Sequence, residues 1–242
     1  MKKLLLLFSL LLPLQALAAV AFVTSSSGID TSGADAQVET GSLDTTGTTD
    51  PVVVACMSYR QNAAQTVTGM THAGNAMTQI VSTLTDGGGA LACFYRVGSA
   101  SGVVQGTVSA APTNMQIGAL VFSGAHQVTP IGTQATATSG GTDSAATTTA
   151  AVSSAADGMV ADGLMIRGSP TSIAVLDAGQ TERESESAAA SVHFRMSTEA
   201  GDASVTMGWT WVNNQRWAHM VIPIAAAAAA PSSGLFLRRR RN

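Results

Sequence analysis

Short β-type segments separated by turn residues run through almost the whole sequence. Segments such as VVVACMSYR (residues 52–60) and MQIGALVFS (residues 115–123) are apolar and β-branched, and Gly, Asn or Asp interrupts the series at spacings of roughly 8–12 residues. No long amphipathic helical pattern is present. Many short strands bury their apolar faces best against one another, so the sequence predicts an all-β fold, an antiparallel two-sheet sandwich.

These segments form one continuous series from residue 19 to residue 224. No linker divides the series, and no internal repeat of fixed period is present. Roughly 200 residues can bury a substantial core as one unit. We therefore expect a single β-sandwich domain over residues 19–224, followed by a flexible Ala-rich tail over residues 225–242 that ends in an arginine cluster.

The C-terminal segment ASVTMGWTWVNNQRWAHMVIPI carries all three tryptophans of the chain. Its large apolar residues alternate with small or polar ones, as in a strand with one buried face. Asn213 and Asn214 tolerate the positive φ of a tight turn, so the segment predicts a β-hairpin centred on them. In that register Trp209 faces the core, and Trp211 lies beside Arg216, where we expect a cation–π contact.

The other face of this hairpin would carry Trp217, His219 and Thr210. Small neighbours would leave the indole face open, and an aromatic ring with a polar edge suits sugar rings. These three residues are therefore the candidate ligand-binding site, with a glycan or another cell-surface polymer as the partner. The alternative is that a second layer covers this face and that the residues belong to a core.

Residues 1–18, MKKLLLLFSLLLPLQALA, have the pattern of a bacterial secretory signal peptide, with two lysines, a short apolar run and an Ala-Leu-Ala cleavage signal. The sequence therefore predicts export to an extracellular, periplasmic or surface-associated location. Export permits a disulfide between Cys56 and Cys93, which both lie in expected strands. Two buried free thiols are the alternative.

Charge is distributed unevenly along the chain. Both lysines lie in residues 1–18 and four of the ten arginines end the chain, so the body between them has six arginines against fifteen acidic residues. Such an acidic body argues against nucleic acid as a partner, since phosphate binding needs basic clusters on the folded surface. The arginines at residues 238–241 predict contact with anionic surfaces, with a sorting signal or a passive end as alternatives.

The sequence contains no motif that specifies a catalytic or metal site. The four histidines, His72, His126, His193 and His219, have no zinc-ligand spacing, and there is no nucleophile elbow. Aspartates in the N-terminal loops do not form a calcium-binding loop. Glutamates in the charged segment 180–187 would need a facing carboxylate across a cleft to hydrolyse glycosides. We therefore predict a non-enzymatic protein without cofactor or metal, and a solvated loop at residues 180–187.

Several segments together resemble a known kind of domain. In chain order, VVVACMSYR, VTGMTHAGNAMTQI, ALACFYRV, IGALVFSGAHQVTPIG, GQTERES and RWAHMVIPI look like the strands and turns of a jelly-roll-type β-sandwich that occurs in uncharacterised secreted and phage-associated bacterial proteins. The resemblance covers residues 19–224 and implies a jelly-roll-like fold. It implies no catalytic residue.

These observations lead to three hypotheses about function. The first is a secreted or surface module that binds a glycan at Trp217. The second is a structural subunit of a surface layer, filament or virion that assembles through its sheet edges. The third is a hydrolase with a loop-borne carboxylate site, which requires Glu and His side chains to converge in a cleft.

Overall fold

The computed structural model describes residues 19–61, 64–143, 145–188 and 191–228. Within these ranges the chain is all-β and antiparallel, and no helix is present that is long and apolar enough to cross a membrane. The predicted signal peptide and residues 229–242 of the predicted tail lie outside the described residues. The strands are β1 (Ala21–Asp30), β2 (Gln37–Glu39), β3 (Leu43–Asp44), β4 (Val52–Arg60), β5 (Val67–His72), β6 (Asn75–Ala76), β7 (Thr78–Gln79), β8 (Leu84–Asp86), β9 (Gly89–Val97), β10 (Ser101–Gly102), β11 (Val104–Val108), β12 (Asn114–Ser123), β13 (Ala135–Thr138), β14 (Ala145–Val152), β15 (Met159–Arg167), β16 (Thr171–Val175), β17 (Thr181–Ala188), β18 (Val192–Ala200) and β19 (Val205–Ile224).

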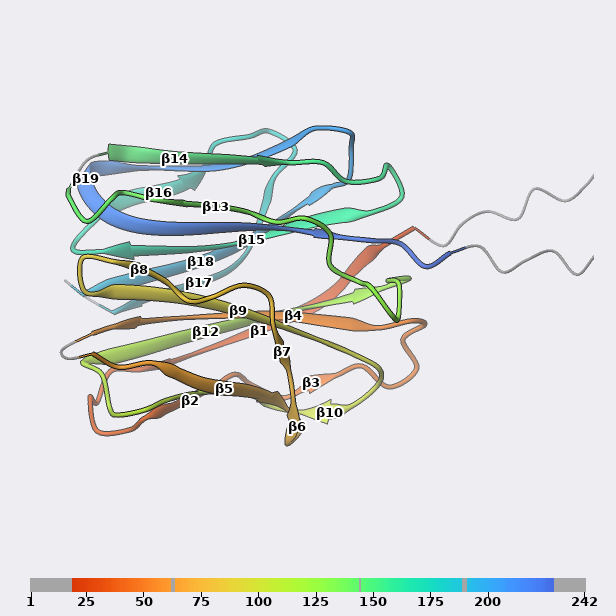
Figure 1. The fold of residues 1–242 in the computed structure, drawn as a ribbon, viewed down its shortest axis with the longest axis horizontal. Helices are drawn as coiled ribbons and strands as arrows, with labels where there is room; N and C mark the ends of the chain where they lie inside the picture. Colours follow the sequence, from red (N-terminus) through yellow and green to blue (C-terminus); the bar gives the residue numbers. More distant parts are fainter. Residues whose placement is uncertain (1–18, 62–63, 144, 189–190, 229–242) are drawn as a thin grey trace, which may run out of the picture.

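The strands stack in layers (Figure 1). A six-stranded sheet lies in the middle, in the order β1–β12–β4–β9–β7 with β8 also on β9. The sheet β2–β11–β5–β6 packs on one of its faces, and β13–β19–β15–β18–β17 packs on the other. β14 and β16 pair with β19 and form an outer layer, while β3 and β10 form a small pair of their own. The sequence predicted a sandwich of two sheets, and the structure adds layers to both sides of the middle sheet.

The middle sheet is apolar on both faces, and this explains the extra layers. β4 is buried along nearly its whole length. Its residues Val54 and Cys56 face the core that β15, β18 and β19 close, whereas Val53 and Ala55 face the core on the side of β5 and β11. A strand covered on both faces has a continuous apolar sequence in place of an alternating one. The segment VVVACMSYR has this form.

The two apolar segments predicted as strands, residues 52–60 and 115–123, form β4 and nearly all of β12. β4 has the predicted bounds, and Ala73 and Gly74 both have positive φ in the tight turn that joins β5 to β6. The segment predicted as a solvated loop at residues 180–187 is an exception, since Thr181–Ala188 forms β17. β17 pairs with β18 only, so it is an edge strand whose charged side chains can remain in contact with water.

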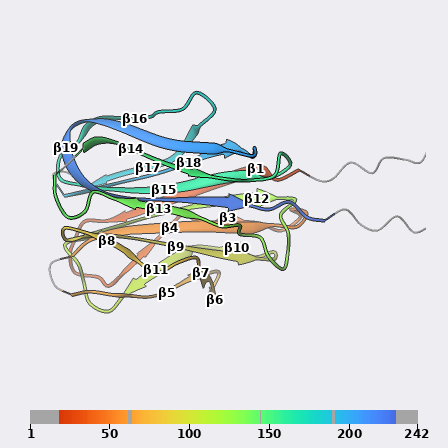
Figure 2. The same ribbon diagram turned by 45° about the horizontal axis from the view of Figure 1, so that its top comes forward.

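The predicted hairpin is wrong. β19 (Val205–Ile224) is one long strand that bends near Asn213, which has a φ of 75° (Figures 1 and 2). Trp209, before the bend, lies between β14 and β16, and Ala218, after the bend, lies between β13 and β15. Neither residue has a free backbone edge, so the two halves of β19 do not pair with each other.

The two halves of β19 pack face to face through their side chains. Trp211 lies edge-on against Trp217, with ring centroids 6.5 Å apart. The expected stacking of Arg216 on Trp211 is therefore replaced by contact between two tryptophans. The second half of β19 carries large side chains on both faces. In a hairpin the first half would lie beside the second half in the same sheet, and the face that carries Trp217 would be exposed to solvent. The bend covers that face, and burial of aromatic surface favours it.

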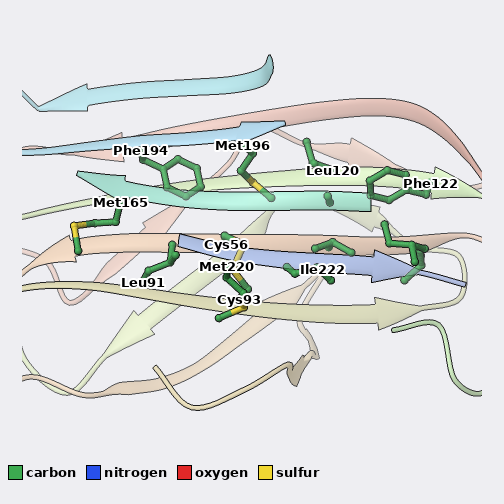
Figure 3. Close-up of a cluster of buried hydrophobic side chains, with 14 of the residues drawn as sticks. Cys56, Leu91, Cys93, Leu120, Phe122, Met165, Phe194, Met196, Met220 and Ile222 are labelled. Carbon is green, nitrogen blue, oxygen red and sulfur yellow. A yellow bond between two sulfur atoms is a disulfide. The ribbon is translucent and has the colours of Figure 1, made fainter. Parts of the chain in front are cut away.

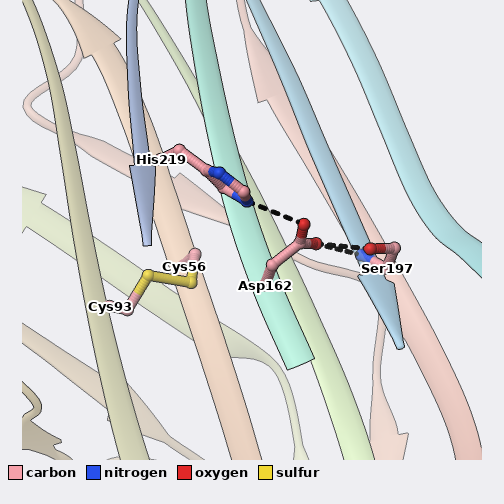
Figure 4. The surroundings of a disulfide bond; sticks show 5 residues. All are labelled: Cys56, Cys93, Asp162, Ser197 and His219. Atoms are coloured by element: carbon pink, nitrogen blue, oxygen red, sulfur yellow. Dashed lines mark hydrogen bonds and ion pairs between the residues drawn. A yellow bond between two sulfur atoms is a disulfide. The ribbon is translucent and has the colours of Figure 1, made fainter. Parts of the chain in front are cut away.

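Cys56 and Cys93 form a disulfide between directly paired positions of β4 and β9 (Figure 4). Both are fully buried in the core between the middle sheet and β15, β18 and β19 (Figure 3). Gly163 of β15 lies against the disulfide, since a Cβ at this position would be 2.8 Å from Sγ of Cys56. The missing side chain lets the two sheets approach over the disulfide. Of the two alternatives that the sequence allowed, the structure has the bonded pair.

Candidate functional site

The structure places the predicted ligand-binding residues largely inside the protein. Trp217 is 8 % exposed and His219 is 0 % exposed. Thr210 is half-buried, and its hydroxyl donates to the carbonyl of Ala146 at 3.3 Å. The expectation that this face is open to solvent is wrong, because the first half of β19 folds over it together with β14. This layer separates Trp217 and His219 from ligands in solution.

His219 belongs to a buried network centred on Asp162 (Figure 4). Nε2 of His219 lies 2.9 Å from Oδ2 of Asp162, and Nε1 of Trp209 donates to the same oxygen at 2.6 Å. The backbone amide and hydroxyl of Ser197 both donate to Oδ1. The side-chain amide of Gln180 donates to Ser197 at 2.6 Å and to Asp162 at 3.3 Å. The network ties β15, β18 and both halves of β19 together.

This network has the residue types of a hydrolase but not the arrangement. In a nucleophilic triad the histidine lies between the serine and the aspartate and removes the serine proton. Here Ser197 donates directly to Asp162, and no bond between Ser197 and His219 occurs within the described residues. All three residues are 0 % exposed. Between the two layers they satisfy one another's buried polar groups.

The glutamates of segment 180–187 lie on the edge strand β17. Glu182 forms an ion pair with Arg195 at 3.2 Å, and Glu186 accepts a hydrogen bond from the hydroxyl of Ser27 at 2.7 Å. Burial raises the pKa of Glu182, and the charge of Arg195 opposes this change. The third hypothesis placed the carboxylates in a loop, and that placement is wrong. Within the ranges that the structure covers, no group of three or more His, Cys, Asp or Glu residues is arranged to hold a metal ion.

A polar pocket of about 330 Å³ lies at the end of the molecule where β19 bends. Three arginines from three strands converge on it. Arg60 and Arg167 are the last residues of β4 and β15, and Arg216 follows the bend of β19. The described chain ends, near residues 19 and 228, lie at the opposite end of the molecule (Figure 1). The side chains of Asp143, Ser191 and Gln215 complete the lining.

Two of these arginines face each other with little to balance their charge. Arg167 and Arg216 occupy directly paired positions of β15 and β19. Like charges at such positions are unfavourable. Both guanidinium groups donate from Nη1 to the same neutral acceptor, the carbonyl of Gly87, in the case of Arg216 at 3.1 Å. Nε of Arg216 lies 3.3 Å from Oδ1 of Asp143 but makes no hydrogen bond within the described chain.

The third arginine adds to the excess of positive charge. Nη1 of Arg60 donates to the hydroxyl of Ser191 at 3.4 Å, which provides no countercharge. Burial lowers the pKa of Arg167, and the neighbouring charges of Arg216 and Arg60 lower it further, whereas Asp143 opposes them. Asp143 is the one acidic residue among the described residues that line the pocket. The described lining therefore holds three cationic groups against one carboxylate.

The turn between β8 and β9 allows the arginines to lie in this position. Gly87 has a φ of +54°, and a Cβ there would lie 2.2 Å from Cδ of Arg216. Gly88, at φ +90°, would place a Cβ 3.6 Å from the guanidinium carbon of Arg167. A side chain at Gly87 would thus displace Arg216 and strain the turn. The two glycines therefore both form the turn and make room for the arginine side chains.

Sequence reasoning did not identify this pocket. Arg60 and Arg167 each end an apolar strand, which is a common position for a solvated charge. Nothing in their spacing shows that β4 and β15 end on the same side, or that the bend of β19 brings Arg216 there. Comparison of this protein with models of protein families, with curated proteins and with solved structures finds no match.

Proposed function

We propose that this protein is a non-enzymatic binding module of the cell exterior, and that it holds an anionic group of a surface polymer in the pocket formed by Arg60, Arg167 and Arg216. The observation that carries the proposal is that Arg167 and Arg216 lie at directly paired strand positions and that both donate to the same neutral acceptor, the carbonyl of Gly87. An incoming oxyanion would supply the charge that the pocket lacks. Guanidinium groups bind oxyanions through short, often paired, charge-assisted hydrogen bonds.

Export and a jelly-roll-like arrangement within a single domain are part of the proposal. The signal-peptide pattern of residues 1–18 supports an extracytoplasmic location. The strand order β1–β12–β4–β9, in which sequence neighbours are not sheet neighbours, supports a sandwich with long crossover connections. The acidic body, with six arginines and fifteen acidic residues, lacks the extended basic surface that a nucleic-acid backbone needs, so its charge supports a local anion site in preference to nucleic-acid binding.

The proposal is tested by thermal unfolding in increasing inorganic phosphate, with chloride added to keep the ionic strength constant. A ligand that binds only the folded protein raises its melting temperature. We expect Arg60→Gln and Arg167→Gln to weaken phosphate binding about tenfold or more, the loss typical of a charge-assisted hydrogen bond. Arg96→Gln removes the same charge outside the pocket, where Arg96 donates to the carbonyl of Gly98, and is the matched control.

Equal stabilisation of all four proteins by phosphate would show that the pocket is not the binding site. Absence of any stabilisation of the wild-type protein, by phosphate or by organic carboxylates, would reject anion binding as the function.

A second candidate function, assembly into a surface layer, filament or virion, is favoured by the free edge of β1. β1 pairs with β12 on one side, and its residues 24–29 (TSSSGI) carry no charge that would oppose pairing with another strand. Val23 is 45 % exposed at a bulge of this edge. If the edge mediates assembly, Val23→Lys will reduce the average mass seen by sedimentation at high concentration. A wild-type protein that remains monomeric at every concentration would reject this function.

A further inference from the structure

We propose that the ligand of the arginine pocket is a carboxylated sugar unit of an acidic polysaccharide, and that its carboxylate enters by taking the place of the Asp143 carboxylate beside Arg216. The inference rests on the proposed anion-binding function of the pocket. It adds the chemical class of the ligand and the way in which the site exchanges its resident anion.

The lining of the pocket selects a hydroxylated anion. Besides the three arginines, the lining that the structure describes consists of Asp143, Gly168, Ser191 and Gln215, and none of these described residues has an aliphatic or aromatic side chain. Gln215 offers an amide, and the hydroxyl of Ser191, which accepts hydrogen bonds from Arg60 and Asn114, still has its proton to donate to a hydroxyl of a sugar ring. The cavity of about 330 Å³ lies at the lower end of the range for small-molecule sites, as suits one unit of a polymer.

Asp143 shows which group the subsite beside Arg216 accepts. Its Oδ1 lies 3.3 Å from Nε of Arg216, and its side chain is 63 % exposed. The pair is therefore close to water, and ion pairs in that position are weak. Asp143 follows β13 and precedes β14, outside any strand. A ligand carboxylate can replace it at the guanidinium while the hydroxyls of the ligand bind elsewhere in the pocket, and the displaced aspartate is then solvated.

Calorimetric titration with glucuronate and with glucose, at constant ionic strength, tests this inference. We expect glucuronate to bind the wild-type protein and glucose to bind at least about tenfold more weakly, because it lacks the charged group. Asp143→Asn removes the carboxylate that competes with the ligand for Arg216, so glucuronate should bind this variant more tightly. An exposed ion pair is weak, so we expect the gain in affinity to be only about two- to fivefold. Asp35→Asn, at an exposed position that is not part of the described lining of the pocket, should bind as the wild-type protein does.

The outcomes separate this inference from the proposed function. If Asp143→Asn and wild type bind glucuronate equally while Arg167→Gln loses binding, exchange with Asp143 is rejected and anion binding stands. If inorganic phosphate binds more tightly than glucuronate, the sugar class is rejected and anion binding again stands. If Arg167→Gln and Arg60→Gln bind glucuronate as well as the wild type, both proposals fail.

Discussion

His72 shows how burial of one polar side chain makes stability depend on pH. It is 0 % exposed in β5, and within the described residues neither ring nitrogen makes a well-aligned hydrogen bond. Burial lowers the pKa of His72 from its ordinary value of 6.5, and the charge of Arg96 lowers it further, whereas the backbone of Leu43 opposes the change. The pKa of His193 is also lowered, by burial and by Arg195. Both histidines favour the neutral form in the folded protein.

We expect the stability to decrease as the pH falls below 6.5. The unfolded chain binds a proton on His72 more readily than the folded protein, so protons stabilise the unfolded state in this range. His72→Leu should reduce the dependence of the melting temperature on pH between 6.5 and about 5.5, and adding His193→Gln should reduce it further. Thermal unfolding at several pH values measures the slope. An unchanged slope in the double variant would contradict the assignment.

The buried carboxylate of Asp162 connects β15 and β18 to both halves of β19. Its carboxylate accepts hydrogen bonds from Trp209, Ser197 and Gln180 and contacts His219, and the whole group is buried. Asp162→Asn replaces one acceptor oxygen by an amide that donates, which leaves a buried donor unpaired. We expect a loss of about 1–3 kcal/mol in the free energy of unfolding.

Denaturant unfolding measures the effect of Asp162→Asn, with the exposed Asp35→Asn as control. A loss no larger than that of the control would show that Asp162 has no role in holding the layers together. Near-ultraviolet circular dichroism reports the environment of Trp209 in the same samples, because its indole donates to Asp162.

At the scale of elements, the bend of β19 decides which side chains become core. The Asn213–Asn214 pair was recognised from the sequence as a place where the chain turns, and Asn213 does adopt a positive φ of 75°. Whether the halves then pair by backbone hydrogen bonds or pack by side chains depends on the partners that distant strands provide. β13, β14, β15 and β16 occupy the edges of both halves, so packing is the remaining option.

Asn213→Val tests the conformation at the bend. A β-branched residue at positive φ costs on the order of 1–2 kcal/mol, and Asn213 is exposed, so packing hardly changes. Asn213→Gly should be neutral within a few tenths of a kcal/mol, since glycine accepts this φ. Asn214→Val is the matched control at a neighbouring exposed position without positive φ. Equal stability of the two valine variants would contradict the role of Asn213.

At the scale of the whole molecule, the disulfide closes a loop in the centre of the stack. Cys56 and Cys93 are 37 residues apart and lie between the middle sheet and the layer of β15, β18 and β19. A loop of this length removes conformational entropy from the unfolded chain worth about 3–4 kcal/mol. We expect the fully reduced protein to unfold at a correspondingly lower denaturant concentration than the oxidised protein, as measured by tryptophan fluorescence. Identical midpoints would show that the crosslink does not stabilise the fold.

The sequence by itself determined the local features of this protein, because they depend on residues that are near one another in the chain. Apolar runs and turn residues identified the segments that form β4 and β12, and they identified the all-β class. They did not identify β17, since the charges of an exposed edge strand resemble those of a loop.

Only the tertiary structure decided which faces are covered and which charges meet. Trp217 and His219 were expected at the surface and lie in a core, because β19 bends and its first half returns over its second half. Arg60, Arg167 and Arg216 are far apart in the sequence and share one pocket, because their strands end or bend at the same end of the stack. Contacts of this kind arise from the order of strands in a sheet and from the stacking of sheets. Neither can be read from the alternation of apolar and polar residues within a single segment.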